Sequence, residues 1–251
     1  TVFKSALKPF EWQFQRHLHK AIKDPVLRAK LTPDYPLGCK RILISNEYYE
    51  TLARPNVDVV TDNIAEVTPT GIRTKDGQEH PVDAIIYGTG FQATDFLAPM
   101  KITGRDGVDL NQVWRDGAEA YLGMTVSGFP NLFLLYGPNT NLGHNSIVYM
   151  LESQFSYILD AVKTLQQRDL RFVDVRSQVQ GVYNRWVQKQ IKNTIWDAGC
   201  TSWYKTASGK NTNNWPGFTL VYRYKTRHFD SQDYELAVKS ARILPLQVAA
   251  A

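Results

Sequence analysis

Two short apolar runs that each end in a glycine turn constrain the fold of this chain most strongly. Residues 82–87 lead into Gly88-Thr89-Gly90, and residues 131–136 lead into Gly137-Pro138. An apolar run that enters a tight loop is typical of a strand buried on both faces. The strongest helical periodicity follows the second run, over residues 147–165. Buried strands in alternation with helices favour an α/β fold.

Other elements are expected from local patterns. Phe10, Phe14 and Leu18 recur at four-residue spacing, which predicts a helix within residues 4–22. Asp24-Pro25 has the pattern of an N-cap followed by a first-turn proline, so a short helix is expected up to residue 31. Further expected elements are a helical turn over 46–52, strands over 57–61, 64–68 and 72–75 with a hairpin turn at 76–77, a helix over 179–196, and a strand over 218–224.

Composition excludes several classes of protein. The 251 residues are 43% hydrophobic, enough for a sizeable core, and no apolar stretch approaches the roughly 20 residues that span a bilayer. The first residues lack an apolar signal region, so we expect a cytoplasmic protein without a membrane span. Cys39 and Cys200 have no paired spacing, which indicates neither a disulfide framework nor a zinc site, and no metal site is expected.

The net charge of +5 is concentrated near two parts of the chain. Residues 1–41 carry nine lysines and arginines against three acids, and residues 198–229 carry five against none. Such a distribution is compatible with nucleic acid, with a polyanionic small molecule, or with ordinary solvated surface.

Several residues are candidates for ligand contact. Gly88, Gly90 and Ala93 match the dinucleotide-binding pattern G-x-G-x-x-A after an expected strand. Pro99, however, stops any following helix early, and the dinucleotide fingerprint needs that helix. A close approach of the backbone to a ligand is therefore a better interpretation of this segment. The polar loop 137–146 enters a helix whose N-terminus suits an electron-rich ligand edge, or else simply supplies an N-cap. Trp203 combines a stacking face with nearby cations, although composition alone favours packing of the loop on its own aromatics.

Taken together, these segments resemble the flavin-dependent class B monooxygenases, most closely the Baeyer–Villiger type. The resemblance rests on an ordered series: 36–49 (PLGCKRILISNEYY), 82–91 (VDAIIYGTGF), 121–133 (YLGMTVSGFPNLF), 137–138 (GP) and 201–204 (TSWY). It implies FAD and NADPH as cofactors and parts of two dinucleotide-binding, Rossmann-like domains, C-terminal halves only. The two G-x-G-x-x-G loops of the family are absent, so the chain is expected to be the C-terminal part of a longer enzyme.

The resemblance also implies a domain division. Residues 1–37 correspond to a helical segment, 38–88 to the returning part of the NADP-binding domain, and 89–251 to the returning part of the FAD-binding domain with a C-terminal substrate and nucleotide loop.

Roles can be transferred to matching positions. Arg41 matches the arginine that stabilises the negatively charged flavin peroxide, and Lys40 matches a lysine that faces the 2′-phosphate of NADPH. Trp203 matches a tryptophan in a mobile segment that closes on the nicotinamide nucleotide and the substrate.

The remaining expected cofactor-binding residues are backbone contacts. Gly88, Gly90 and Phe91 match the chain crossing beside the cofactors, and Asn145, Ser146 and Ile147 match the helix start that meets the pyrimidine edge of the flavin.

The implied reaction inserts one oxygen atom of O₂ beside the carbonyl of a small molecule, converting a ketone to an ester or lactone. Transfer of oxygen to nitrogen or sulfur is the alternative within the family, because residues 211–217 depart from the better-known ketone oxidisers. A non-catalytic basic module that binds nucleic acid is the alternative of another class, and the resemblance makes nucleic acid an unexpected partner.

Overall fold

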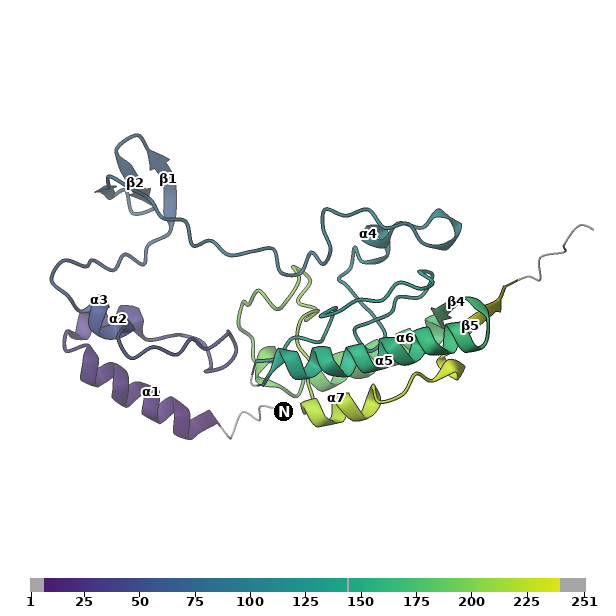
Figure 1. Cartoon of the computed structure of the whole chain (residues 1–251). Helices are drawn as coiled ribbons and strands as arrows, with labels where there is room; N and C mark the ends of the chain where they lie inside the picture. Colours follow the sequence, from purple (N-terminus) through teal and green to yellow (C-terminus); the bar gives the residue numbers. More distant parts are fainter. Residues whose placement is uncertain (1–6, 144, 240–251) are drawn as a thin grey trace, which may run out of the picture. The chain divides into compact units, whose positions relative to one another are not determined.

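The computed structural model describes residues 7–143 and 145–239, which form a mixed α/β chain (Figure 1). The chain divides into two compact units. The first unit comprises the chain up to residue 92 together with residues 198–200, and the second comprises residues 93–197 and the chain from residue 201.

The helices of the first unit lie within the ranges that the sequence predicts. Helix α1 spans Lys8–Ala21 with a proline in its first turn, and α2 spans Pro25–Leu31. The Asp24 carboxylate caps α2 by accepting hydrogen bonds from the backbone N–H groups of Val26 at 2.9 Å and Leu27 at 3.3 Å. Helix α3 is the expected short turn, Tyr48–Leu52. These elements form locally because the signals for them, the Asp24 cap of α2 and the apolar spacing of α1, lie within or directly beside the elements.

A three-stranded antiparallel sheet follows, with strand order β1-β2-β3. Its strands are β1 Ile64–Thr68, β2 Gly71–Thr74 and β3 Glu79–Pro81. The expected hairpin turn between β2 and β3 is confirmed: Gly77 has φ +88°, and the Thr74 N–H donates to the carbonyl of Gln78 at 3.0 Å.

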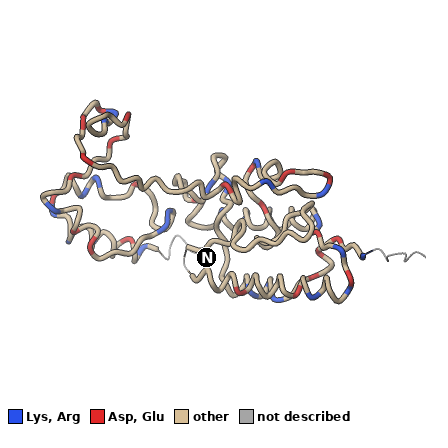
Figure 2. The backbone as a smooth tube through the Cα atoms, turned by 45° about the horizontal axis from the view of Figure 1, so that its top comes forward, with Lys and Arg blue, Asp and Glu red and all other residues tan. Residues whose placement is uncertain are grey.

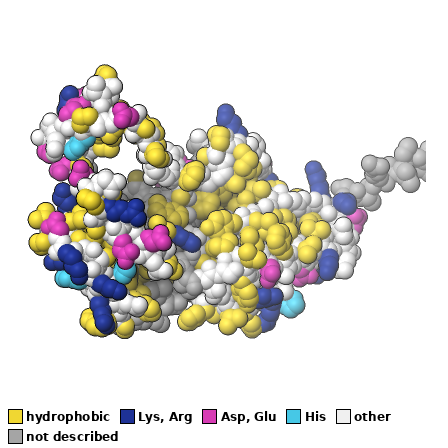
Figure 3. Space-filling model, turned by 60° about the vertical axis from the view of Figure 1, so that its left-hand side comes forward, with side chains coloured by type: hydrophobic (Ala, Val, Ile, Leu, Met, Phe, Trp, Pro, Cys, Tyr) yellow, Lys and Arg dark blue, Asp and Glu magenta, His cyan; other side chains and the backbone are white. Residues whose placement is uncertain are grey.

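Two apolar runs of the first unit are not strands, contrary to the expectation for residues 82–87 and 57–61. Ile86 is 96% exposed, and in the neighbouring run 42–44 the Ile44 side chain is also 96% exposed. A central strand becomes regular when its N–H and C=O groups pair with neighbours on both sides. No other segment in the described part of this unit forms a strand pair with these runs, so they remain extended and exposed. Hydrophobic side chains lie on the molecular surface in the view of Figure 3.

The second unit is built on two long helices and a two-stranded sheet. Helix α5 spans Ile147–Gln167, strand β4 Leu170–Val175 and helix α6 Ser177–Ile191. Strand β5, Tyr234–Val238, pairs antiparallel with β4, so that Val175 lies opposite Tyr234. Shorter elements are 3₁₀ turn η2 Arg105–Gly107, α4 Leu110–Val113, η3 Ile195–Asp197, α7 Thr219–Lys225 and η4 Ser231–Asp233.

The expected strand over 218–224 is wrong, because this segment is helix α7. Valine and tyrosine favour strands by propensity, but tertiary burial decides here. Thr219, Tyr222 and Thr226 are buried, and their spacing of three and four residues places them on one helical face. The expected strand over 131–136 is also wrong: its backbone makes isolated bonds, such as Leu134 N–H to the Met124 carbonyl at 2.8 Å, and no ladder.

The core of the second unit lies between α5, α6, α7 and the β4–β5 pair. Trp215 is fully buried, with its ring centroid 5.1 Å from that of Tyr222 and 5.7 Å from that of Trp186. A smaller apolar cluster forms separately around Trp114 and Phe129. The strongest apolar periodicity of the sequence, in α5, therefore supplies the main core as expected.

Buried tyrosine hydroxyls form a hydrogen-bonded group within this core. The Tyr234 hydroxyl lies 3.0 Å from that of Tyr157 and 3.1 Å from the Thr125 hydroxyl. Burial raises the pKa of Tyr234 to about 12, because the charged phenolate is poorly solvated there. Burial also raises the pKa of Tyr157.

We predict that the unit loses stability as the pH rises above 10. An unfolded tyrosine loses its proton near pH 10, whereas folded Tyr234 holds its proton up to about pH 12, so stability that is complete below pH 10 is lost between these values. In Tyr234→Phe, the fall in unfolding free energy between pH 9 and pH 12 should be smaller by roughly 2 kcal/mol. Denaturant unfolding at several pH values measures this fall. The exposed Tyr224→Phe is the matched control, and an equal fall in both variants would contradict the prediction.

Candidate functional site

Lys40 and Arg41 follow a tight turn in the first unit. Gly38 has φ +86°, and the Cys39 N–H donates to the carbonyl of Pro36 at 3.1 Å. The ammonium of Lys40 lies 4.1 Å from the ring centroid of Tyr35, a cation–π contact that holds it near the turn. Arg41 begins the extended run and is exposed. The turn is therefore followed directly by two adjacent cations.

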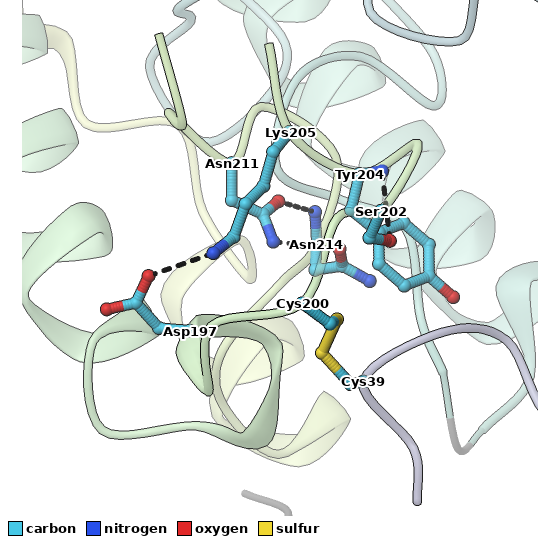
Figure 4. The surroundings of a disulfide bond; sticks show 8 residues. All are labelled: Cys39, Asp197, Cys200, Ser202, Tyr204, Lys205, Asn211 and Asn214. Carbon is cyan, nitrogen blue, oxygen red and sulfur yellow. Dashed lines mark hydrogen bonds and ion pairs between the residues drawn. A yellow bond between two sulfur atoms is a disulfide. The ribbon is translucent and has the colours of Figure 1, made fainter. Parts of the chain in front are cut away.

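The same turn contains a disulfide, which corrects the expectation that the two cysteines are unpaired. Cys39 is bonded to Cys200, with a Cα–Cα distance of 6.4 Å, although 161 residues separate them in sequence (Figure 4). Spacing patterns detect cysteine pairs that are close in sequence, and this pair is close only in the fold. The signal in the sequence that could have indicated this pair is the position of each cysteine beside candidate ligand-binding residues. Cys39 directly precedes Lys40-Arg41, and Cys200 lies three residues before Trp203.

The segment 88–91 offers open backbone. An added Cβ at Gly88 or Gly90 would meet no atom within 4 Å, and Gly90 has φ +81°. Phe91 is 97% exposed. The described structure places no packing partner against this segment, which leaves room for a ligand to approach the backbone closely.

Asn145, Ser146 and Ile147 form the start of α5. The Ser146 hydroxyl is the N-cap and accepts from the Tyr149 N–H at 3.4 Å, as one of the sequence interpretations expected. The Asn145 amide donates to the hydroxyl of Thr219 at 3.0 Å, which ties the helix start to α7. Ile147 is half-buried against the core. This 21-residue helix directs its positive dipole end toward the polar loop.

Trp203 lies in a short loop whose ends are bridged. The Asp197 carboxylate and the Lys205 ammonium form an ion pair at 3.1 Å, and Lys205 is only 14% exposed (Figure 4). Trp203 is 44% exposed, and its ring centroid lies 4.3 Å from that of the buried Tyr204. The loop thus presents one aromatic face to its surroundings while the neighbouring aromatic anchors it.

A buried amide cluster, which the sequence interpretation missed, joins the loop before α5 to the segment after Trp203. The backbone N–H groups of Asn139 and Asn141 donate to the carbonyls of Thr212 and Asn213 at 2.7 and 2.9 Å. The Asn211 side chain accepts from the N–H groups of Asn213 and Asn214 at 3.1 and 3.0 Å. Residues 211–214 are therefore internal structure, and their divergence from the ketone oxidisers says little about substrate.

The basic residues of the C-terminal stretch are engaged within the second unit. Lys205 pairs with Asp197, Lys210 with Glu119 at 2.7 Å, and Arg223 approaches Glu152 at 4.0 Å. The other two cations lie over aromatic rings: Lys225 over Trp186 and Arg227 over Tyr224. Along the backbone, acidic positions are interspersed with basic ones in both units (Figure 2). These contacts favour solvated, internally paired surface over a nucleic-acid interface.

The nine candidate residues divide between the two units. Lys40, Arg41, Gly88, Gly90 and Phe91 belong to the first, and Asn145, Ser146, Ile147 and Trp203 to the second. Within 7–143 and 145–239, no cluster of three or more His, Cys, Asp or Glu side chains suits a metal ion. In the same ranges, no helix has the length and apolar character needed to cross a bilayer.

Comparison with known proteins identifies relatives of this chain. It is 52% identical over 223 residues to a Baeyer–Villiger monooxygenase of Pseudomonas aeruginosa, covering 88% of this chain and 42% of that protein. It is 45% identical over 238 residues to a Baeyer–Villiger monooxygenase of Streptomyces coelicolor, covering 94% of this chain and 45% of that protein. It is also 41% identical over 235 residues to an FAD-binding monooxygenase of Aspergillus niger, covering 91% and 38%. No family model matches the chain.

Solved structures agree with the sequence relatives. The structure of OTEMO with FAD and NADP superimposes with a TM-score of 0.83 at 29% identity, over 94% of this chain and 45% of that one. Cyclohexanone monooxygenase of Rhodococcus sp. Phi1 bound to NADP⁺ gives a TM-score of 0.78 at 27% identity, over 88% and 43%.

These matches place the chain among the FAD-binding monooxygenases. Within that class it matches a portion of the Baeyer–Villiger monooxygenases, and it spans less than half the length of the relatives it matches. The resemblance found in the sequence is thereby confirmed.

We predict that Asn211→Ala destabilises the second unit. The substitution leaves the buried N–H groups of Asn213 and Asn214 without acceptors, which should lower the unfolding free energy by roughly 2–4 kcal/mol. Asn193→Ala removes an exposed amide at the end of α6 and should change stability by less than about 0.5 kcal/mol. Denaturant unfolding followed by tryptophan fluorescence compares the two, and similar values for both would refute the role of the cluster.

Proposed function

We propose that this chain is the C-terminal part of an FAD- and NADPH-dependent monooxygenase that inserts one oxygen atom of O₂ next to a carbonyl, producing an ester or lactone from a ketone. The observation that carries the proposal is the 52% identity over 223 residues to a Baeyer–Villiger monooxygenase. The rest of the enzyme would supply the phosphate-binding loops for both cofactors. Its place of action would be the cytoplasm.

The exposed apolar runs support the idea that this chain works together with more polypeptide. Ile44, Ile86 and Phe91 are each at least 96% exposed, although their sequence context is that of buried strands. The relatives are more than twice as long as the part matched here. The additional chain of such a protein would pair with these runs and cover them, since burial of apolar surface is favourable.

The cationic pair suits the anionic parts of the cofactors. Arg41, at the exposed end of the turn, would stabilise negative charge that develops on oxygen at the flavin, as a fixed cation does in a site shielded from water. Lys40, a compact point charge, would face the 2′-phosphate of NADPH. When bound, reduced FAD supplies the oxygen chemistry, and the residues of this chain orient and shield it.

The second unit supplies complementary donors. The start of α5, with Asn145, Ser146 and Ile147, would meet the pyrimidine edge of the flavin through backbone N–H groups at the positive helix end. Trp203, 44% exposed and anchored by Tyr204, would stack on the nicotinamide nucleotide. The open backbone at Gly88 and Gly90 fits a cofactor passing close to the chain. The residues present thus fit the cofactor edges, while the pyrophosphate loops lie outside this sequence.

Oxygen transfer to sulfur or nitrogen is tested by product analysis. The protein that contains this chain together with the cofactor-binding loops is supplied with NADPH, a cyclic ketone and a thioether. We expect the lactone as a product. Sulfoxide as the exclusive product would assign the protein to the heteroatom-oxidising alternative.

We predict that the 251-residue chain by itself binds little FAD. No G-x-G-x-x-G loop followed by a helix is present to hold the pyrophosphate. The purified chain, mixed with FAD and passed over a desalting column, should elute with far less than one flavin per protein by its absorbance. A yellow, stoichiometrically flavinylated chain would contradict this expectation.

We predict that Arg41→Ala in the longer protein separates two steps. Flavin reduction by NADPH, followed by the loss of flavin absorbance without oxygen, should stay within a few-fold of the unaltered rate. Ester formation should fall by at least about 100-fold, as for the loss of one electrostatic stabiliser of a developing oxyanion. Arg54→Ala, in an exposed cation outside the candidate site, is the control. An equal loss of both steps would argue against the assigned role.

A further inference from the structure

The disulfide holds the loop that carries Trp203 at a defined point. Cys200 lies within residues 197–205, whose ends are joined by the ion pair between Asp197 and Lys205 at 3.1 Å. The two attachments act on different parts of the loop: the ion pair closes its base, and the disulfide holds the chain inside it (Figure 4). Gly199, with φ +88°, makes the turn that leads into Cys200.

The C-terminal end of the loop is fastened within the second unit, because the Tyr204 carbonyl accepts from the N–H of Thr212 and from the side-chain amide of Asn213, each at 3.3 Å. Two further hydrogen bonds lie within the loop. The Lys205 N–H donates to the Ser202 carbonyl at 3.0 Å, and the Ser202 hydroxyl accepts from the Tyr204 N–H at 3.4 Å. Both bonds span Trp203, because they join Ser202, directly before it, to residues directly after it. On its N-terminal side, the covalent attachment is Cys200, and three residues of chain place the Cα atom of Trp203 within about 11 Å of the Cα atom of Cys200.

We propose that Cys39 and Cys200 form a redox-sensitive clamp that positions the loop carrying Trp203. In the oxidised state the loop is fastened to the turn that precedes Lys40-Arg41. In the reduced state its base stays closed by Asp197 and Lys205, and residues 199–203 gain freedom of movement. The clamp acts on a short loop with fixed ends, so its effect is local.

The cysteines differ in a way that suits reversible oxidation. Cys39 is fully buried, whereas Cys200 is half-buried. The accessible thiol, as thiolate, attacks a peroxide oxygen, the O–O bond breaks, and a sulfenic acid forms at Cys200. The Cys39 sulfur then attacks that sulfur and water leaves. Altogether two thiols and one hydrogen peroxide give one disulfide and two water molecules. A dithiol reverses the change by donating two electrons and two protons, becoming a cyclic disulfide itself.

The functional meaning of the clamp rests on the proposed function. If Trp203 stacks on the nicotinamide nucleotide, the bond limits how far the loop that carries it can move in the oxidised state. A monooxygenase that releases peroxide when oxygen transfer fails would then fasten its own nucleotide loop. The mechanical proposal itself needs neither cofactor, so its test is independent of the proposed reaction.

The test uses the complete 251-residue chain in two states. One sample is treated with one equivalent of hydrogen peroxide and the other with dithiothreitol, and each is then alkylated with iodoacetamide in denaturant. Mass spectrometry should find no alkylated cysteine in the first sample and two in the second. Two alkylated cysteines in both samples would overturn the proposal, because the pair then does not form under oxidising conditions.

Hydrogen exchange then separates a clamp from a merely structural bond. Reduction should speed amide exchange in residues 199–203 at least tenfold, while residues 211–215, held by the amide cluster, should change by less than twofold. Unchanged exchange in 199–203, or an equal increase in both segments, would overturn the local clamp. Cys200→Ser should exchange like the reduced chain in both treatments. If Cys39→Ser does not fold because residue 39 is buried, the reduced unaltered chain gives the same comparison.

Discussion

Backbone pairing is the constraint on which the rest of this structure depends. A strand is regular only when its N–H and C=O groups find partners, and an apolar strand also needs cover on its faces. Strand β4 has both, because β5 pairs with it and α5 packs against it. Residues 42–44 and 83–87 have neither in the described chain, so strongly strand-forming sequences are extended and exposed. Order in this molecule follows the availability of partners rather than local propensity.

The same constraint explains how much of the fold could be predicted. Helices α1 and α2 and the β2–β3 hairpin follow from caps, apolar spacing and turn residues a few positions apart, and the sequence predicts them closely. Helix α5 follows from its long apolar period. Helix α7 was expected as a strand, because its β-branched and aromatic residues favour strands by propensity. The helical signal is weaker, since it consists of a few buried residues spaced by three and four positions. Pairing of β4 with β5 joins segments about 60 residues apart and left no local pattern.

The candidate site divides in a similar way. Local chemistry was sufficient to single out the Ser146 cap, since a helix N-terminus is visible in a few residues, whereas Lys40 and Arg41 were singled out by the resemblance to a family. The Cys39–Cys200 bond and the buried Asn211 cluster were not predictable by spacing, because their partners meet only after the chain has folded. Asparagine side chains in a loop are ordinarily solvated. Only the structure shows that the Asn211 side chain is buried and accepts hydrogen bonds from backbone N–H groups.

The disulfide also turns most of the chain into a closed ring. The ring runs from Cys39 to Cys200 and contains α3, the three-stranded sheet, α5, β4 and α6. A single peptide cut anywhere between these cysteines therefore yields two pieces that stay covalently joined until a thiol reductant is added. A protease nick in an exposed run such as 82–91 would pass unnoticed on a non-reducing gel, and the disulfide would keep the two pieces of the cleaved chain at intramolecular concentration.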